Sequence, residues 1–447
     1  MDIARGIGDF LTLKRNFHTL RGQDLRDWQR SRCNELVRFA VSASPLYRRL
    51  YAGRDLENFE ELPTIDKAVA TEGFDDLNTA GLHRSEVEAF ALGMEASGDQ
   101  LRYLRGPDGR DFVIGMSSGT SGSRGLVVTE RAISEGLPFV FAARSGLPIR
   151  LLPWRIVFML RVFSKAFQDI NAPLIRLDYV NTMTPVQTIL DKVGRMRAKI
   201  LMAPPSMLRI LADHAPSMPS LRLLVSYAEV LEEADEAAIR SAFDLPLIQI
   251  YQASEGPIGS ACRLGSLHIN EDLVYVELLD GEGRPVTEPG QKARRMLVTN
   301  LYNRVQPLIR YELNDLVELG EPCPCGSGFR TIRRVIGRAD DVLWFASAEG
   351  GRQYVFPDLV SRWIISASGL VSDYAIAQAG DDSLELRLSV TRDEAQAKAL
   401  ADVLASLRAG LERHGCLVPA IRFAGPVELP PPGMKRKRFV SIARKGT

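Results

Sequence analysis

The chain has 447 residues, of which 45% are hydrophobic and 25% are charged. This composition is close to the globular average and excludes a disordered or fibrous protein. Lys and Arg total 56 against 55 for Asp and Glu, so no net field exists to hold a nucleic acid or an anionic membrane.

Neither a membrane span nor a disulfide-bonded secreted fold is expected. The most apolar stretch, residues 137–163, is interrupted by Arg144, Arg150, Arg155 and Arg161, whereas a spanning helix needs about 20 residues with few charges. The N-terminus lacks the apolar segment and the cleavage site of a signal peptide. Five cysteines in a chain of this length do not form a disulfide scaffold. We therefore expect a reduced, cytoplasmic protein.

The first three quarters of the chain predict an α/β domain. A helix is expected from about residue 24 to 52, with an interruption at Pro45. From about 113 to 316, short apolar runs typical of strands alternate with amphipathic helical patterns. The clearest runs are residues 112–116, 199–202, 221–226, 247–251 and 296–299, and the clearest helices are 206–214 and 232–242.

The last hundred residues differ in character. Residues 374–378, 384–390 and 421–423 read as strands, and 393–414 read as one long helix, which together predict a small α+β unit. The polar turn at 337–341 is the expected boundary. The predicted domains are therefore residues 1–336 and 337–447. Two domains agree with a soft prior of about one domain per 150 residues, which suggests two or three.

The strongest local signal is a Ser/Thr/Gly-rich loop directly behind the strand at 112–116. Its glycines free the backbone to wrap an anion, and its hydroxyls and N–H groups can donate to phosphate oxygens. The spacing does not fit a Walker P-loop, and the alternative is a flexible linker. The candidate phosphate-binding residues are Ser117, Ser118, Gly119, Thr120, Ser121, Gly122 and Arg124.

Two further groups of polar residues follow later strands. Tyr251, Ser254 and Glu255 come directly behind the strand at 247–251. They suit stacking on a base, contact with phosphate and binding of Mg²⁺, respectively. Asp315 follows the run Arg310-Tyr311 and can accept hydrogen bonds from two ribose hydroxyls, although a lone Asp in this position more often caps a turn.

The order of these motifs resembles the adenylate-forming enzyme superfamily. A Ser/Thr/Gly loop is followed by Y-x-x-S-E, R-Y-x-x-x-D, G-R-x-D-D and a lysine near the C-terminus. The resemblance is strongest to the branch of phenylacetate–CoA ligases, capsule-biosynthesis proteins and the synthetase that adenylylates a deazaflavin coenzyme. The segments 44–48, 62–67 and 323–326 also look like that branch.

This resemblance implies a large N-terminal domain of mixed sheets and helices that binds ATP and the acid, and a small mobile C-terminal domain. The loop residues named above would cover the ATP phosphates, Tyr251 would stack near adenine, and Glu255 would bind Mg²⁺. Ser254 would contact phosphate, and Asp315 would hold the ribose. Arg338 would lie near ribose or phosphate, and Asp340 would be the hinge.

Lys435, in the segment Gly433 to Arg438, best matches the catalytic lysine of the family, with Lys437 as the second choice. The alternative for that segment is a basic solvated tail. Such a lysine would bridge the carboxylate and the α-phosphate while an acyl-adenylate and pyrophosphate form. Two departures from the family pattern stand out: Arg124-Gly125 replaces a common Pro-Lys, and only the ends of a Tyr-Arg-Thr-Gly-Asp consensus remain at 311–315.

A Cys₃His set suggests a metal site. Cys262 and His268 are followed by Cys323 and Cys325 in a tight Cys-Pro-Cys-Gly turn, a donor set that favours tetrahedral Zn²⁺ in a closed, structural site. Some members of the resembled branch carry zinc at matching positions. The alternative is a set of reduced buried thiols beside an unrelated histidine. Cys33 and Cys416 look like ordinary core residues.

The identity of the acid is left open by the sequence. Candidate residues for its pocket are Phe139, Phe141, residues 201–205 and 226–229, and Gln252. They would suit an aromatic or medium-sized acid, although a place in the core is as good a reading for each of them.

Three functions stay open. The first is an acid–thiol ligase with CoA or a carrier protein as acceptor, acting on a small carboxylic acid. The second is adenylation with an amide, ester or nucleotidyl product. The third is a zinc-stabilised nucleotide-binding protein without catalysis, which the altered loop favours and the retained Glu255 and Lys435 oppose. The resemblance also allows a homodimer.

Overall fold

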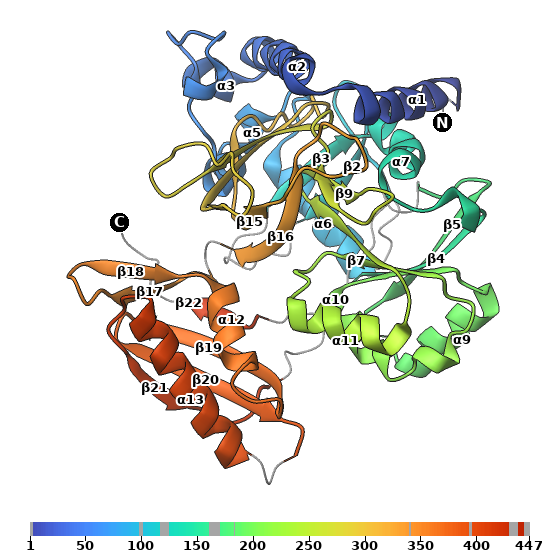
Figure 1. The fold of residues 1–447 in the computed structure, drawn as a ribbon. Helices are drawn as coiled ribbons and strands as arrows, with labels where there is room; N and C mark the ends of the chain where they lie inside the picture. The colour runs from blue at the N-terminus through green and yellow to red at the C-terminus, as the bar shows by residue number, and fades with distance from the viewer. Residues whose placement is uncertain are drawn as a thin grey trace. The chain divides into compact units, whose positions relative to one another are not determined.

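The computed structural model describes residues 3–97, 102–116, 125–160, 170–182, 184–338, 341–392, 396–428 and 437–441 (Figure 1). The chain forms two compact units. Unit 1 comprises Met1–Leu231, Asp235–Leu313 and Val317–Arg334. Unit 2 comprises Glu232–Ala234, Asn314–Leu316 and Val335–Thr447.

The N-terminal part of unit 1 is helical. The predicted helix at 24–52 is two helices, because α2 ends and α3 begins at Ser44. The Ser44 hydroxyl accepts from Tyr47 N at 3.4 Å and so caps α3. Pro45 occupies the first turn of α3, where a backbone N–H is not needed. The helix α1 was not expected from the sequence. The helices of this part are α1 (Ile3–Thr19), α2 (Gly22–Ala43), α3 (Pro45–Leu50), α4 (Lys67–Glu72), α5 (Phe74–Leu77) and α6 (Arg84–Ser97), with a 3₁₀ turn at Phe59–Glu61.

A ten-stranded mixed sheet forms the centre of the large unit, in the order β12-β15-β16-β10-β9-β8-β7-β6-β4-β5. The strands from β8 to β5 are mutually parallel, and those on the other side of β8 pair antiparallel where their register is described. The parallel strands are nearly continuous apolar runs because helices cover the sheet. Their bounds are β4 (Trp154–Leu160), β5 (Ile175–Asn181), β6 (Ile200–Ala203), β7 (Leu223–Tyr227) and β8 (Leu247–Ala253), and the rest are β9 (Gly256–Ala261), β10 (Leu267–Ile269), β12 (Lys292–Ala293), β15 (Asp315–Leu319) and β16 (Thr331–Arg338).

Helices α9 (Val186–Met196), α10 (Pro205–Ala212) and α11 (Glu233–Phe243) connect the parallel strands, and Figure 1 shows them side by side beneath β4 and β7. The apolar faces of these helices pack on Val157, Leu201 and Leu224 of the sheet. The alternation of strand and helix predicted for residues 113–316 is therefore present.

Two small antiparallel sheets complete unit 1. One has the order β1-β2-β3 and the other β11-β13-β14. Helix α7 (Arg131–Arg144) follows β3, and its residue Ala143 packs with Leu13 of α1. The strands are β1 (Leu104–Arg105), β2 (Asp111–Met116), β3 (Leu126–Glu130), β11 (Val274–Leu279), β13 (Arg295–Asn300) and β14 (Tyr311–Leu313), and 3₁₀ turns lie at Ile149–Leu151 and Ala215–Ser217.

Unit 2 contains a two-stranded sheet and a four-stranded sheet of order β21-β20-β19-β22. Along β19 and β20, buried and less buried residues alternate, as expected for a sheet with one covered face. Helices α12 and α13 cover that face (Figure 1). The elements are β17 (Leu343–Ala346), β18 (Arg352–Val355), α12 (Pro357–Ile365), β19 (Val371–Gly380), β20 (Ser383–Val390), α13 (Gln396–Arg413), β21 (Ala420–Phe423) and β22 (Phe439–Ser441).

The large mixed sheet and the small C-terminal sheet confirm the fold class expected from the sequence. Among the described residues, the helices are all too short or too polar to pass through a lipid bilayer. Cys33 and Cys416 are buried core thiols, as expected.

A buried tyrosine ties the N-terminal helices to the segment that precedes β14. The side chain of Tyr47 is fully buried, and its hydroxyl donates to Pro307 O at 2.9 Å and accepts from Ile309 N at 3.0 Å. Burial raises the pKa of Tyr47 well above its ordinary value, so the phenol stays protonated and can make both bonds.

We predict that Tyr47→Phe lowers the free energy of unfolding by about 2 kcal/mol, because a buried N–H and a buried C=O lose their partner. The matched control is Tyr51→Phe, since the Tyr51 hydroxyl makes a longer, partly buried bond of 3.3 Å to Pro63 O. The measurement is denaturant unfolding of both variants and the parent protein. Equal losses in the two variants would contradict the role assigned to Tyr47.

Candidate functional site

The carboxyl ends of the parallel strands bring several predicted site residues to one edge of the central sheet. Ala203 at the end of β6 is paired with Ser226 of β7, and Tyr227 is paired with Ile250 of β8. The turns that follow these strands are therefore neighbours. In open α/β sheets this edge is where ligands bind, because the loops after the strands leave a crevice there.

Glu255 lies in the two-residue turn between β8 and β9, and two groups hold it. Asn300 Nδ2 donates to its backbone oxygen at 2.8 Å, and its carboxylate is hydrogen-bonded to the Tyr311 side chain. Burial, followed by the Glu255 charge, raises the pKa of Tyr311, so the phenol keeps its proton and donates. The carboxylate is half-buried and thus has a defined orientation at the sheet edge.

The other two predicted residues of this turn are more open. Ser254 is exposed, as a group that meets a ligand must be. Tyr251 is half-buried on β8, and its hydroxyl lies 3.8 Å from Met296 Sδ. With the spacing Y-x-x-S-E, Tyr251 therefore lies near the end of β8, and Ser254 and Glu255 lie in the turn that follows.

The candidate acid-pocket residues separate into two groups. Leu201 and Ala203 are fully buried between the sheet and its helices. They therefore belong to the core, which was the alternative to a place in the acid pocket. The residues at the strand ends stay available: Glu229 Oε2 accepts from Ser206 N at 3.3 Å at the start of α10, and Gln252 is exposed. The remaining candidates also divide, since Tyr227 and Pro204 are buried, Phe141 packs edge-on against Trp154, and Phe139 is half-buried on α7.

Several predicted residues lie at the ends of described strands or outside the described residues. Asp315 is the first residue of β15 and is half-buried, and Arg338 is the last residue of β16. Outside the described residues lie Asp340, Lys435 and the loop residues Ser117, Ser118, Gly119, Thr120, Ser121, Gly122 and Arg124.

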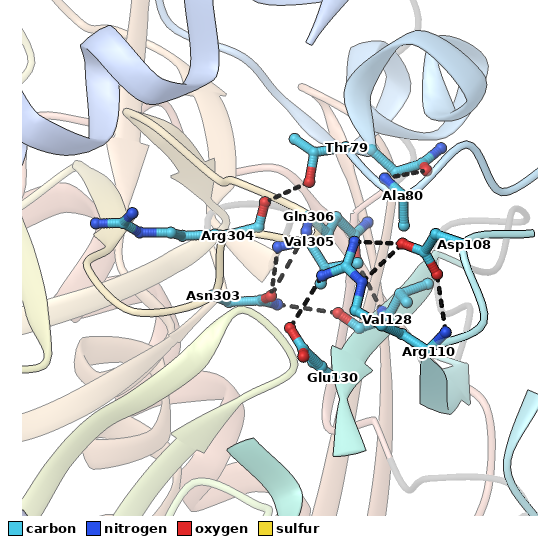
Figure 2. Close-up of polar contacts among 11 residues, drawn as sticks. Thr79, Ala80, Asp108, Arg110, Val128, Glu130, Asn303, Arg304, Val305 and Gln306 are labelled. Atoms are coloured by element: carbon cyan, nitrogen blue, oxygen red, sulfur yellow. Dashed lines mark hydrogen bonds and ion pairs between the residues drawn. The ribbon is translucent and has the colours of Figure 1, made fainter. Parts of the chain in front are cut away.

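The strands on both sides of the predicted phosphate loop form a paired hairpin. Met116, the last residue of β2, is paired with Leu126, the first residue of β3, so the chain leaves and re-enters the hairpin at adjacent positions. Figure 2 shows the residues around the outer edge of β3, where Asn303 and Gln306 contact the Val128 backbone. Sequence reasoning missed these two residues. The available signal was a run of carboxamides three residues apart, Asn300, Asn303 and Gln306.

The four predicted metal ligands come together in unit 1. Their ligand atoms all lie within 4.8 Å of one another. Cys262 Sγ is 3.7 Å from Cys323 Sγ, and Cys325 Sγ is 3.5 Å from His268 Nε2. A tetrahedral zinc ion with Zn–S bonds of about 2.3 Å requires ligand separations of about 3.8 Å, so the donor set and its spacing fit Zn²⁺.

The surroundings of this cluster also fit a metal centre. His268 is fully buried, and its Nδ1 lies 3.0 Å from Phe329 O, which leaves Nε2 directed at the thiols. Burial lowers the pKa of His268, so the ring is neutral near pH 7, the form that binds metal. Leu264 N donates to Cys262 Sγ at 3.3 Å, and Gly265 and Gly326 take left-handed conformations in the two turns that carry the cysteines.

Helix α1 packs directly on this cluster. The Phe17 ring meets the His268 ring edge-on at 5.2 Å and the Phe329 ring at 5.5 Å. Arg144 lies over Phe17 at 5.4 Å, and its Nη2 donates to both carboxylate oxygens of Asp272, at 2.6 and 2.7 Å, in a buried ion pair. The N-terminal helix is thus bound to the loops that the cysteines hold together.

Comparison with known proteins gives a short sequence match and a long structural one. No profile of a known protein family matches the chain. Protein CapK of Staphylococcus aureus is 31% identical over 119 residues, which is 26% of this chain and 25% of that protein. The chain thus spans only about a quarter of the curated relative that it matches.

The structural match extends over nearly the whole chain. A 2-hydroxyisobutyryl-CoA ligase solved in the postadenylation state with its acyl-adenylate superposes with a TM-score of 0.68 and 16% identity, covering 96% of this chain and 92% of the ligase. The AtGH3.15 acyl acid amido synthetase superposes with a TM-score of 0.57 and 14% identity, covering 93% and 89%. At these identities the likeness establishes the fold.

We predict that the purified protein contains zinc and that Cys325→Ser loses it, because a tetrahedral site with three ligands holds the ion much more weakly. Trypsin should then cleave within α1 at Lys14 or Arg15 several-fold faster, since the surface that holds Phe17 is no longer fixed. Zinc content by elemental mass spectrometry and limited proteolysis are the measurements.

The control is Cys416→Ser, which removes a buried thiol of unit 2 outside the cluster. It should keep both the zinc and the protection of α1. A zinc-free parent protein, or unchanged zinc in Cys325→Ser, would refute the metal site.

Proposed function

We propose that this chain, which has the fold of the adenylate-forming ligases, uses ATP to activate a carboxylic acid and releases pyrophosphate. The observation that carries the proposal is the placement of Glu255. Its carboxylate lies at the carboxyl edge of the parallel strands and is hydrogen-bonded to Tyr311, while Asn300 Nδ2 donates to its backbone oxygen. The ligase fold over 96% of the chain supports the same reading.

The chemistry requires two anions to meet. A carboxylate oxygen of the acid attacks the α-phosphorus of ATP, the bond to the bridging oxygen breaks, and the products are an acyl-adenylate and pyrophosphate. Mg²⁺ held by Glu255 would offset charge on the phosphates. Lys435 would contact the carboxylate and the α-phosphate as charge shifts between them.

The remaining roles follow from the resemblance. Tyr251 would stack near adenine, Ser254 would contact phosphate, and Asp315 would hold the ribose hydroxyls. The loop from Ser117 to Gly122, with Arg124, would cover the phosphates, and Arg338 would lie near ribose or phosphate. Rotation about Asp340 would then remove Lys435 from the site and admit the second substrate.

We propose a thiol, from CoA or a carrier protein, as the acceptor of the acyl group. The solved 2-hydroxyisobutyryl-CoA ligase, which has this fold, is described in a complex with an acyl-adenylate and CoA. An amine acceptor is the second candidate, because the acyl acid amido synthetase shares the fold over 93% of this chain. The acid would be aromatic or medium-sized.

We also propose that Cys262, His268, Cys323 and Cys325 bind a structural Zn²⁺. Four protein ligands leave no open position for a water or a substrate, so the ion would act in folding and not in the reaction. The support is the spacing of the four donors and the neutral, oriented imidazole of His268.

The test is ATP–pyrophosphate exchange with Mg²⁺ over a panel of aryl and aliphatic acids. We predict acid-dependent exchange in the parent protein and a loss of at least about a hundredfold in Lys435→Ala and in Glu255→Gln, because each removes a charge that acts on the transition state. Addition of CoA, a carrier protein or an amine then identifies the acceptor from the product.

The matched controls are Lys437→Ala, in the same basic segment, and Glu282→Gln, an exposed carboxylate in the turn after β11. If Lys437→Ala abolishes exchange and Lys435→Ala does not, the catalytic lysine is Lys437. MgATP binding without exchange for any acid would favour the nucleotide-binding protein. Absence of MgATP binding would refute the proposed function.

A further inference from the structure

Strand β3 is an edge strand whose outer backbone groups are paired by side chains. It lies at one end of the order β1-β2-β3, so part of its backbone has no neighbouring strand. Val128 N donates to Gln306 Oε1 at 2.9 Å, and Asn303 Nδ2 donates to Val128 O at 3.0 Å. Gln306 Nε2 donates to Leu126 O at 3.0 Å. The two carboxamides thus take the place of a fourth strand (Figure 2).

The carboxamide groups are well suited to this pairing. Asn303 and Gln306 are 7% and 4% exposed, so water does not compete for β3. A primary amide offers a donor and an acceptor together, as a peptide group does. Gln306 uses both on backbone positions two residues apart, which is the repeat of a strand. Val305, which lies between Asn303 and Gln306 in the sequence, packs in the same apolar cluster as Val128 and Leu126.

The same segment also holds Glu255. Asn300 Oδ1 accepts from Asn303 N at 3.1 Å, and Asn300 Nδ2 donates to Glu255 O at 2.8 Å. Asn300 is 5% exposed. A series of hydrogen bonds, buried except for the part-buried one to Glu255 O, therefore runs from the turn of Glu255, through residues 300–306, to β3.

Building on the proposed adenylation, we infer that Asn303 and Gln306 are positioning residues for MgATP. They hold the hairpin β2–β3, from which the predicted phosphate loop extends, in a defined place relative to Glu255. Only the two-residue strand β1 pairs with the hairpin β2–β3 from the other side, and an isolated hairpin has little stability of its own. Binding of a phosphate chain at two places, the hairpin and Glu255, requires both to be held at a fixed separation before ATP arrives.

The experiment compares Gln306→Glu with the parent protein, using MgATP as the ligand in isothermal titration calorimetry. The substitution keeps size and the acceptor for Val128 N but turns the donor toward Leu126 O into a second oxygen. At about pH 8 we expect MgATP to bind about tenfold more weakly, since the hairpin is no longer held in place.

Near about pH 6, below the raised pKa that burial gives a carboxyl group, the introduced acid is protonated and can donate again. The affinity relative to the parent protein at the same pH should then recover. The matched control is Thr79→Ala, which removes a hydrogen bond of 2.8 Å to Arg304 O on the side of the segment away from β3 (Figure 2). It should bind MgATP as the parent protein does.

Three results would contradict the role assigned to Gln306. If Gln306→Glu lowers the melting temperature but binds MgATP like the parent protein at both pH values, the side chain is only structural and the inference is wrong. If Gln306→Glu does not fold, Gln306→Met, which removes both bonds without adding charge, should bind severalfold more weakly at both pH values, and parent-like affinity would overturn the inference. If the parent protein itself does not bind MgATP, the proposed function fails, and this inference fails with it.

Discussion

The large unit depends on one constraint: the buried, irregular segment from Asn300 to Tyr311 must satisfy its backbone polar groups without belonging to a continuous strand. It does so by bonding to partners on several sides. The Tyr47 hydroxyl bonds Pro307 O and Ile309 N, and Arg310 N donates to Thr299 Oγ1 at 2.9 Å. The Arg310 guanidinium adds side-chain bonds to Leu62 O and to the Glu277 carboxylate, the latter at 2.8 and 3.0 Å. Removal of any partner would leave a buried group unpaired, which costs more than the bond itself contributes. The helical N-terminal part, the sheet of β14 and the hairpin β2–β3 are held together by this segment.

The geometry of the candidate site follows from that constraint. Glu255 is bound at its backbone by Asn300, the first residue of the segment, and at its carboxylate by Tyr311, the last. The hairpin is bound from the middle of the segment by Asn303 and Gln306. A group that meets a divalent cation and a loop that meets phosphates must keep a fixed separation to stabilise a developing charge. We propose that in this protein the amide groups of Asn300, Asn303 and Gln306, outside the proposed MgATP site, set that separation.

The cysteine cluster has a comparable organising effect elsewhere in the large unit. Cys262 and His268 belong to the hairpin of β9 and β10, whereas Cys323 and Cys325 lie on the turn before β16. Held together, they form the surface on which Phe17 of α1 packs. The buried pair of Arg144 and Asp272 is next to it, and such a pair requires its surroundings to stay closed because each charge is costly when unpaired. We therefore expect the proposed metal binding and the docking of the N-terminal helix to be linked.

Local patterns in the sequence were enough to predict the fold class, the place of Ser254 and Glu255 directly behind a strand, and the Cys₃His set, because each depends on neighbouring residues or on donor chemistry. The phosphate loop and the ribose contact of Asp315 stay predictions that rest on the resemblance. The sequence also predicted the break at Pro45, from the chemistry of a helix start. It did not indicate helix α1, the bond from Tyr311 to Glu255, or the roles of Asn303 and Gln306. Asn303 and Val128 are 175 residues apart, and a side-chain bond to a distant backbone leaves no periodic trace along the chain. The tertiary fold alone brings such groups together. Once buried, the backbone groups of an edge strand have no water to bond, so they need a side-chain partner such as a carboxamide.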